Sequence, residues 1–285
     1  MIYLKLLVVA LVWGGTFIAT RIAAQHLEPF AGAFLRFSFA CMGLLGLVWG
    51  SRKPMPRPDR RAMRYYLILA VSGIIGYNFF FFSALKLIPA SRASLLVALN
   101  PVLVLFATAA LHGEKLRWVK VMSGLLALFG AVVVIARGEL NHLFDHFGLG
   151  GWFALGCPLS WAVYTLASRQ APAGQSPLMT TTWVCLIGTL GLLPLALWEG
   201  LPLAALSPQV WIALIYLGLL GTVLGFVWYA EGIRAIGTTR TAIFNNLVPV
   251  FGVVLSVMLL HESVHWSVAA GGALVVAGVA VLNLT

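Results

Sequence analysis

Several polar residues of this sequence stand inside long apolar runs, where a polar side chain needs a partner. Four of them are amides, Asn78, Asn100, Asn245 and Asn246, and Tyr77 stands directly before Asn78. An amide in hydrocarbon surroundings can bind a polar or zwitterionic solute, or it can hold a neighbouring helix by a hydrogen bond. From the residues alone both interpretations stay open.

Aromatic residues accompany these amides in a pattern that suits a solute-binding wall. Trp13 and Trp161 each lie near the middle of an apolar run, and Asn78 and Phe82 are four residues apart, on one helical face. A tryptophan face can stack on an apolar or cationic solute, or it can serve core packing. The candidate substrate-binding residues are Trp13, Tyr77, Asn78, Phe82, Asn100, Trp161, Tyr164, Asn245 and Asn246.

Two prolines and two arginines suggest positions for bending and gating. Pro101 and Pro249 each remove a backbone donor from an apolar run, so each can mark a hinge, expose carbonyl groups or fix a static kink. Arg21 and Arg169 follow the two tryptophans by about two helical turns, at the ends of their runs. They can gate opposite mouths of a cavity or extend to the membrane surface.

The carboxylates Glu114 and Glu262 stand at the ends of runs, so proton coupling is the less favoured of two interpretations for them. For Glu114 and Glu262, capping of the following helix or pairing with a neighbouring basic or histidine residue is the favoured interpretation. Glu231 is followed by Arg234 at i+3, which favours a local ion pair.

The sequence contains no pattern typical of an enzyme. It has no Walker loop, no HExxH motif and no GxSxG motif within an apolar run. The cysteines Cys41, Cys157 and Cys185 lie in apolar runs without metal-binding spacing, which favours buried free thiols. We therefore expect no catalytic residue, no metal and no cofactor.

The amino-acid composition indicates that these apolar runs lie in a lipid bilayer. The chain is 61% hydrophobic and 9% charged, with a mean hydropathy of +0.99, whereas a soluble domain carries roughly a quarter charged residues. A helix needs ~20 apolar residues to cross a bilayer, where its backbone must satisfy its own hydrogen bonds. We predict an all-α membrane protein of about ten helices, at residues 3–24, 30–50, 64–86, 91–111, 117–136, 149–169, 178–198, 208–232, 239–260 and 266–284.

The formal charge of +10 indicates an orientation rather than a nucleic-acid partner. Thirteen of the eighteen Lys and Arg residues fall in the N-terminal flank or the even-numbered loops, and six of them cluster from Arg52 to Arg64. This bias predicts that both termini are cytoplasmic. We expect a multi-pass protein of the bacterial inner (plasma) membrane, with a first run that is retained rather than cleaved.

The chain repeats itself with a shift of 148 residues. Without a gap, the shift aligns residue types that are rare in membrane segments: Trp13 with Trp161, Arg21 with Arg169, Pro29 with Pro177, Arg92 with Arg240, Pro101 with Pro249, Glu114 with Glu262 and Gly130 with Gly278. Five runs per copy is an odd number, so the second copy enters the membrane from the opposite face. We predict two inverted five-helix repeats, residues 1–137 and 149–285, around a central cavity.

Two long stretches carry a resemblance to one membrane family. Pro101, Glu114, Gly124 and Gly130 belong to NPVLVLFATAALHGEKLRWVKVMSGLLALFGAVVVIA, which the second copy repeats as VPVFGVVLSVMLLHESVHWSVAAGGALVVAGVAVL. Both stretches, and the openings VWGGTFIATR and SWAVYTLASR, resemble EamA domains of the drug/metabolite transporter superfamily. The resemblance covers nearly the whole chain and implies ten helices, a central cavity and export of amino acids or other small metabolites. In general pattern the chain is similar to the bacterial branch that exports aromatic amino acids.

The favoured function is therefore a secondary transporter that exports small metabolites by alternating access, with amino acids of broad range, including aromatic or neutral ones, as first candidates. The alternatives are an exporter of drugs, quaternary cations or nucleotide sugars, and a non-transporting membrane sensor. The expected partners are a small-molecule substrate and membrane lipids, without nucleic acid. Energy coupling, by proton antiport or facilitated diffusion, and oligomeric state stay open, although a monomer fits.

Overall fold

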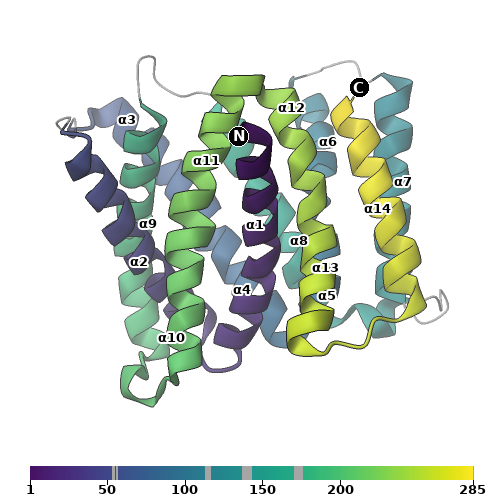
Figure 1. Cartoon of the computed structure of the whole chain (residues 1–285), viewed down its shortest axis with the longest axis horizontal. Helices are drawn as coiled ribbons and strands as arrows, with labels where there is room; N and C mark the ends of the chain where they lie inside the picture. The colour runs from purple at the N-terminus through teal and green to yellow at the C-terminus, as the bar shows by residue number, and fades with distance from the viewer. Residues whose placement is uncertain (53–54, 56, 113–116, 137–142, 170–175, 285) are drawn as a thin grey trace.

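The computed structural model describes residues 1–52, 55, 57–112, 117–136, 143–169 and 176–284, which form one bundle of helices (Figure 1). Most helices run side by side along a common direction, and both chain ends lie towards the same edge of the bundle (Figure 1). Packed helices that satisfy their own backbone hydrogen bonds are the solution that a lipid solvent demands.

Each predicted run has a helical counterpart, and several runs are divided into shorter helices. The first repeat contains α1 (Ile2–Ala24), α2 (Pro29–Gly50), α3 (Arg60–Leu69), η1 (Ala70–Gly76), α4 (Tyr77–Leu87), α5 (Ala90–Val97), α6 (Asn100–His112) and α7 (Trp118–Ala136). The second contains α8 (Leu143–Ser168), α9 (Pro177–Glu199), η3 (Leu203–Ala205), α10 (Pro208–Ile215), η4 (Tyr216–Leu224), α11 (Gly225–Ile236), α12 (Thr238–Ile243), η5 (Phe244–Asn246), α13 (Leu247–Leu260) and α14 (Trp266–Leu284).

Nine helical stretches of the described residues are long and apolar enough to cross a membrane. They match nine of the ten predicted runs to within a few residues. The other run corresponds to α8, where Gly148 interrupts the helix with a φ of 55° and a ψ of 176°, so that the sixth span follows this glycine. The prediction of an all-α membrane protein with two inverted repeats is confirmed. The repeat limits 1–137 and 149–285 stay a prediction, because residues 137–142 lie outside the described residues.

The crossing of α7 and α14 displays the symmetry of the two repeats. A Cβ atom at Gly130 would lie 2.6 Å from the carbonyl oxygen of Gly271, and a Cβ atom at Gly278 would lie 2.6 Å from that of Ser123. The 148-residue shift converts the first contact into the second. Glycine is needed at both places because any side chain would collide with the backbone of the facing helix.

A second crossing, of α2 with α9, shows where the symmetry axis passes. Cys41 Sγ lies 3.2 Å from Thr189 Oγ1, and these two residues are themselves separated by 148 positions. Equivalent positions of two copies can touch only beside the axis that relates the copies. The pairs α2 with α9 and α7 with α14 therefore lie beside this axis, while α1 with α13 and α4 with α8 also join the two repeats.

The outer surface of the bundle is apolar. Trp49, Phe129, Trp198 and Ile212 are among the many large side chains that are more than half exposed. Soluble monomers rarely expose apolar surface on this scale. Lipid chains would cover these side chains in a membrane, which agrees with the composition.

Candidate functional site: the cavity between the repeats

A cavity of about 380 Å³ lies between the two repeats, and both contribute to its wall. The first repeat supplies residues of α1, α2, α4, α5 and α6, and the second supplies residues of α8, η4, α11, η5, α13 and α14. Eight of the predicted site residues line it, namely Trp13, Tyr77, Asn100, Pro101, Trp161, Asn245, Asn246 and Pro249. Distant parts of the sequence thus surround one space of the size that small molecules occupy.

Two interrupted helices bring the amides to this wall. The fourth span breaks between α5 and α6, directly before Asn100 and Pro101, and the ninth breaks at η5, just before Pro249. Proline fits the first turn of a helix because its missing N–H group is not required there. Interrupted helices around a central site are typical of secondary transporters. The hinge role of the two prolines stays a prediction.

Two π-helical segments, η1 and η4, occupy matching places in the two repeats. A π-helical turn leaves carbonyl groups out of the regular α-helical pattern, and such turns recur at functional sites. Asn78 Nδ2 donates to the Ile74 carbonyl in η1 at 2.9 Å. Thr222 Oγ1 donates to the Leu217 carbonyl in η4 at 3.0 Å. Polar side chains near the cavity therefore help to satisfy both irregular segments.

Trp13 is anchored to the second of these segments. Its indole Nε1 donates to the Gly221 carbonyl at 2.9 Å, and its ring packs against Tyr229 and Phe226 at centroid distances of 5.2 and 6.1 Å. Gly225, which has no side chain, leaves space for the indole. Trp13 thus joins the first repeat to η4 and α11 while it lines the cavity.

Trp161, the equivalent residue, makes ring contacts and has no side-chain hydrogen bond to the described residues. Tyr77 meets its ring edge-on at 5.6 Å, and Tyr164 stacks on it at 4.9 Å. Tyr77 shares the cavity wall with Trp161, whereas Tyr164 lies behind the wall against Gly73. Together the three rings form an aromatic surface between the two repeats.

The asparagines divide between the two interpretations that the sequence left open. Asn245 Nδ2 donates to the Tyr229 hydroxyl at 3.0 Å, and Asn246 Oδ1 accepts from Asn283 Nδ2 at 2.9 Å. Both therefore hold neighbouring helices while lining the cavity. Asn100 differs, because its buried Oδ1 atom has no hydrogen-bond partner among the described residues.

Arg36 also lines the cavity, although it is not one of the substrate-binding residues predicted from the sequence. Its side chain is 9% exposed, and its guanidinium donates to Asn78 Oδ1 at 3.0 Å and to Thr222 Oγ1 at 3.5 Å. A single arginine seven residues inside the apolar helix α2 is the signal that marks it. One cation therefore belongs to the cavity wall, although no charged residue was among the predicted substrate-binding residues.

The remaining predicted residues lie away from the cavity wall. Asn78 is buried behind it and holds Arg36, while Phe82 is fully buried against Gly32. Arg21, near the end of α1, donates to the Leu85 carbonyl at 2.5 Å. Arg169 directly follows α8. The gating roles of these arginines stay predictions.

Comparison with known proteins identifies the family to which this chain belongs. The model of the EamA-like transporter family matches residues 1–136 and again residues 148–284. The chain belongs to this family. Its members are transporters, so the expectation that the protein is not an enzyme is confirmed, and the EamA resemblance read from the sequence is confirmed with it.

Relatives and a solved structure cover nearly the whole EamA chain. An uncharacterised transporter of Bacillus subtilis, YyaM, is 28% identical over 90% of this chain and 85% of its own length. The aromatic amino acid exporter YddG of Ancylobacter novellus is 28% identical over 96% of this chain and 94% of its own. A crystal structure with 26% sequence identity superimposes with a TM-score of 0.68 and covers 99% of this chain and 96% of that one.

Two carboxylates of the EamA chain bind partners that sequence proximity did not predict. Glu262 accepts hydrogen bonds from the Ala90 and Ser91 backbone N–H groups and from Ser91 Oγ, at 2.7, 3.1 and 2.7 Å. It therefore caps α5 of the other repeat, so the prediction of a cap on the following helix is wrong. Glu231 pairs with Lys5 at 2.6 Å rather than with the expected local arginine. Glu114 lies outside the described residues.

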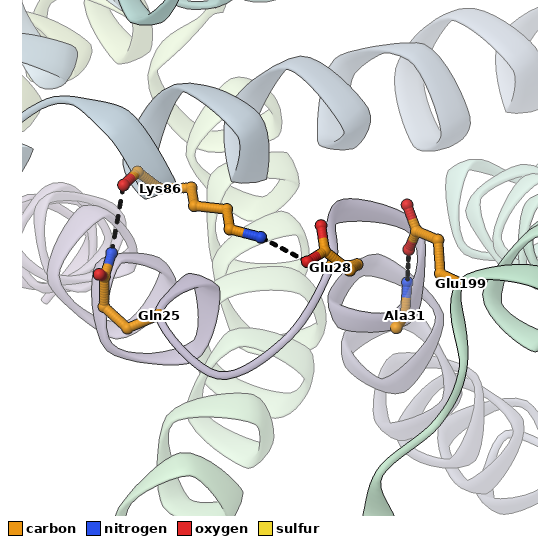
Figure 2. Close-up of polar contacts among 5 residues, drawn as sticks. All are labelled: Gln25, Glu28, Ala31, Lys86 and Glu199. Atoms are coloured by element: carbon orange, nitrogen blue, oxygen red, sulfur yellow. Dashed lines mark hydrogen bonds and ion pairs between the residues drawn. The ribbon is translucent and has the colours of Figure 1, made fainter.

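The edge of the bundle opposite the chain ends carries a second group of contacts (Figure 2). Glu199, at the end of α9, accepts from the Ala31 N–H group in the first turn of α2 at 2.9 Å. Lys86 pairs with Glu28 at 2.5 Å, and its carbonyl accepts from Gln25 at 3.4 Å. Glu199 and Glu262 thus both connect the second repeat to helix starts of the first.

Proposed function

We propose that this EamA protein is a secondary transporter that exports amino acids, including aromatic and neutral ones, by alternating access. The observation that carries the proposal is the cavity between the inverted repeats, which a tryptophan from each repeat lines. A site at the junction of two inverted repeats can open to one membrane face and then to the other when the repeats rock against each other.

The composition of the wall supports amino acids as substrates. Its aromatic surface, formed by Trp13, Tyr77 and Trp161, suits an apolar side chain, and its amides and Arg36 suit polar groups. Such a wall, apolar with a few convergent polar groups, is the usual form of a small-molecule site. The exporter YddG, a relative over nearly its full length, is named for aromatic amino acids.

The alternative substrates fit this wall less well. A quaternary cation would meet the positive charge of Arg36, and no carboxylate from the described residues lines the cavity to attract it. A nucleotide sugar carries two phosphates, and a single arginine can neutralise only part of their negative charge. A non-transporting sensor remains an outcome of the transport experiment below.

We also propose that the edge bearing both chain ends faces the cytoplasm of a bacterial cell, with the bundle in the inner membrane. The basic residues Arg60, Arg61 and Arg64 lie at the start of α3, and Arg234 and Arg240 flank the turn between α11 and α12. These elements begin or end at the edge where the chain ends lie (Figure 1). Basic residues accumulate at the cytoplasmic side of membrane proteins.

Counterflow of a radiolabelled amino-acid panel into proteoliposomes tests the transport proposal. The parent protein should accumulate at least one aromatic or neutral amino acid, and Trp13→Ala and Trp161→Ala should lower that uptake. Trp118→Ala and Trp266→Ala are matched controls, since these tryptophans are also related by the repeat but are 74% and 61% exposed, away from the cavity. If the parent accumulates no member of the panel, the amino-acid assignment fails, and nucleotide sugars and cationic drugs are tested next.

A further inference from the structure

Arg36 is a buried cation without a counter-ion in the described structure. Its side chain is 9% exposed and lines the cavity. Four described carboxylates have other partners, and none of them lines the cavity: Glu28 binds Lys86, Glu199 binds Ala31, Glu231 binds Lys5 and Glu262 binds Ala90 and Ser91. An arginine inside a membrane protein is costly unless an anion or a set of dipoles compensates it.

The dipoles that surround this guanidinium leave it incompletely bound. One terminal nitrogen donates to Asn78 Oδ1 at 3.0 Å, and the other donates to Thr222 Oγ1 at a long 3.5 Å. Its Nε atom is buried and has no acceptor among the described residues. Because arginine keeps its proton under all ordinary conditions, the site cannot relieve the charge by becoming neutral. An anion bound from the cavity would both neutralise this charge and accept from its unpaired donor.

We infer that Arg36 binds the carboxylate of the transported solute, so that the substrates are amino acids recognised by this group rather than amines or neutral metabolites. The inference rests on the proposed function and names the chemistry of its substrate. The planar fork of a guanidinium matches the two oxygens of a carboxylate. Asn78 acts as a positioning residue, because its amide donates to the Ile74 carbonyl and thereby turns its oxygen towards Arg36.

A second unpaired atom of the wall complements this arrangement. Asn100 Oδ1 is a buried acceptor without a donor among the described residues. The ammonium group of an amino acid donates hydrogen bonds, so it needs an acceptor from the cavity wall. Among the described residues of the wall, the fully buried atoms without a partner are thus a cationic donor and an amide acceptor, which match the two charged ends of a zwitterion. Trp13, Tyr77 and Trp161 are left to contact the side chain.

The contacts of Arg36 also connect substrate binding to the junction of the repeats. Asn78 follows the π-helical segment η1 of the first repeat, and Thr222 lies in η4 of the second. A carboxylate that draws the guanidinium towards the cavity competes with both contacts. Substrate binding therefore weakens a contact of Arg36 beside η1 in the first repeat and another in η4 of the second.

Discrimination between phenylalanine and its amide tests the inference. Phenylalaninamide retains the ring and the amine but replaces the carboxylate with a neutral group. The probes are used both as competitors of phenylalanine counterflow and as ligands that raise the melting temperature of the detergent-purified protein. A hydrogen-bonded charge pair predicts that the parent prefers phenylalanine by about tenfold or more. Arg36→Gln should reduce this preference towards one.

Matched variants separate recognition from folding. Arg92 is another buried arginine, but its described contact is to the Ile135 carbonyl and it lies off the cavity wall, so Arg92→Gln should keep the preference. If Arg36→Gln does not fold, Arg36→Lys decides, because it keeps the charge and should keep the preference with weaker binding.

Each outcome of this experiment has one meaning. A parent that transports phenylalanine but does not distinguish it from the amide overturns the role of Arg36 and leaves the proposed function intact. An undiminished preference in Arg36→Gln, or its complete loss in Arg36→Lys, also overturns that role. A parent that transports no amino acid defeats the proposed function itself.

Discussion

Trp13 and Trp161 occupy the same position in the two repeats, yet the structure holds them differently. Trp13 donates a hydrogen bond to the Gly221 carbonyl of the opposite repeat. Trp161 is held by Tyr77 and Tyr164 through ring contacts. The duplicated position provides the ring in both cases, and the surroundings, which are not duplicated, decide what the ring does.

The polar groups around the cavity show the same contrast more strongly. Arg36 and Asn78 of the first repeat correspond to Val184 and Phe226 of the second, while Asn245 corresponds to Val97. By contrast, the glycine crossings, the π-helical segments and the prolines at the helix breaks recur in both copies. The shared features build a symmetric frame, and the unshared residues give one side of the cavity wall its charge.

The largest effect is expected where the two repeats are most alike. Gly130→Leu and Gly278→Leu each place a side chain against a backbone carbonyl that a Cβ atom would approach to 2.6 Å. Overpacking of this kind costs about 1–3 kcal/mol or more. Both variants should lose the single peak of the parent in size-exclusion chromatography, or melt at a clearly lower temperature, and to a similar degree.

Gly46→Leu is the control for this pair, because a Cβ atom at Gly46 meets no atom within 4 Å. Its melting temperature should stay near that of the parent. If one of the two crossing variants behaved like this control while the other failed to fold, the two crossings would not be equivalent.

The next effect concerns the charge that only the first repeat carries. Asn78→Asp places a carboxylate next to Arg36, where Asn78 Oδ1 now lies 3.0 Å from the guanidinium. This internal counter-ion should compete with the substrate and weaken phenylalanine binding about tenfold or more, as expected for a charge-assisted contact. Titration of the melting temperature with phenylalanine measures the change.

Asn78→Ala is the control, since both variants lose the donor to the Ile74 carbonyl but only Asn78→Asp adds charge. Equal affinities for the two would speak against a carboxylate site at Arg36.

The sequence predicted the symmetric part of this comparison well. Length and hydropathy located the spans, and the 148-residue shift revealed the repeat because Trp, Pro and Gly recur in one register. The prolines marked the broken helices, since a residue without an N–H group is restricted to a few helical positions. These features depend on local sequence, so they can be predicted without a structure.

The residues that differ between the repeats were harder to place from the sequence, because their role depends on which way each side chain faces. A helix that is apolar on all sides does not reveal which face meets lipid and which meets protein. For that reason Asn78, Phe82 and Tyr164 were predicted on the cavity wall but lie behind it. Arg36 lines the cavity but was not among the predicted substrate-binding residues. The partner of Glu262 was equally hidden, because Ala90 and Ser91 precede it by more than 170 residues.

Replacement of each tryptophan by phenylalanine sharpens the contrast between the equivalent rings. Trp13→Phe keeps a ring but removes the donor to the Gly221 carbonyl, so it should lower stability by about 0.5–1.5 kcal/mol. Trp161→Phe loses no described hydrogen bond and should melt closer to the parent while it keeps phenylalanine counterflow. The measurement is the melting temperature of each variant without substrate. Equal losses would mean that the indole N–H group of Trp13 has no special role.

The smallest effect is expected at the ion pair that joins the repeats near the chain ends. Lys5 and Glu231 lie 2.6 Å apart, but their side chains are 35% and 43% exposed. Exposed pairs contribute about 1 kcal/mol or less and weaken as salt screens them. Glu231→Gln should therefore lower the melting temperature slightly at low salt and not at all in molar salt.

Glu262→Gln is the comparison at the opposite edge, where one carboxylate accepts three hydrogen bonds from the start of α5. It should cost more than Glu231→Gln and persist in salt, because charged hydrogen bonds to backbone N–H groups at a partly buried helix start are poorly screened. The reverse order would place the stronger connection between the repeats at the edge of the chain ends.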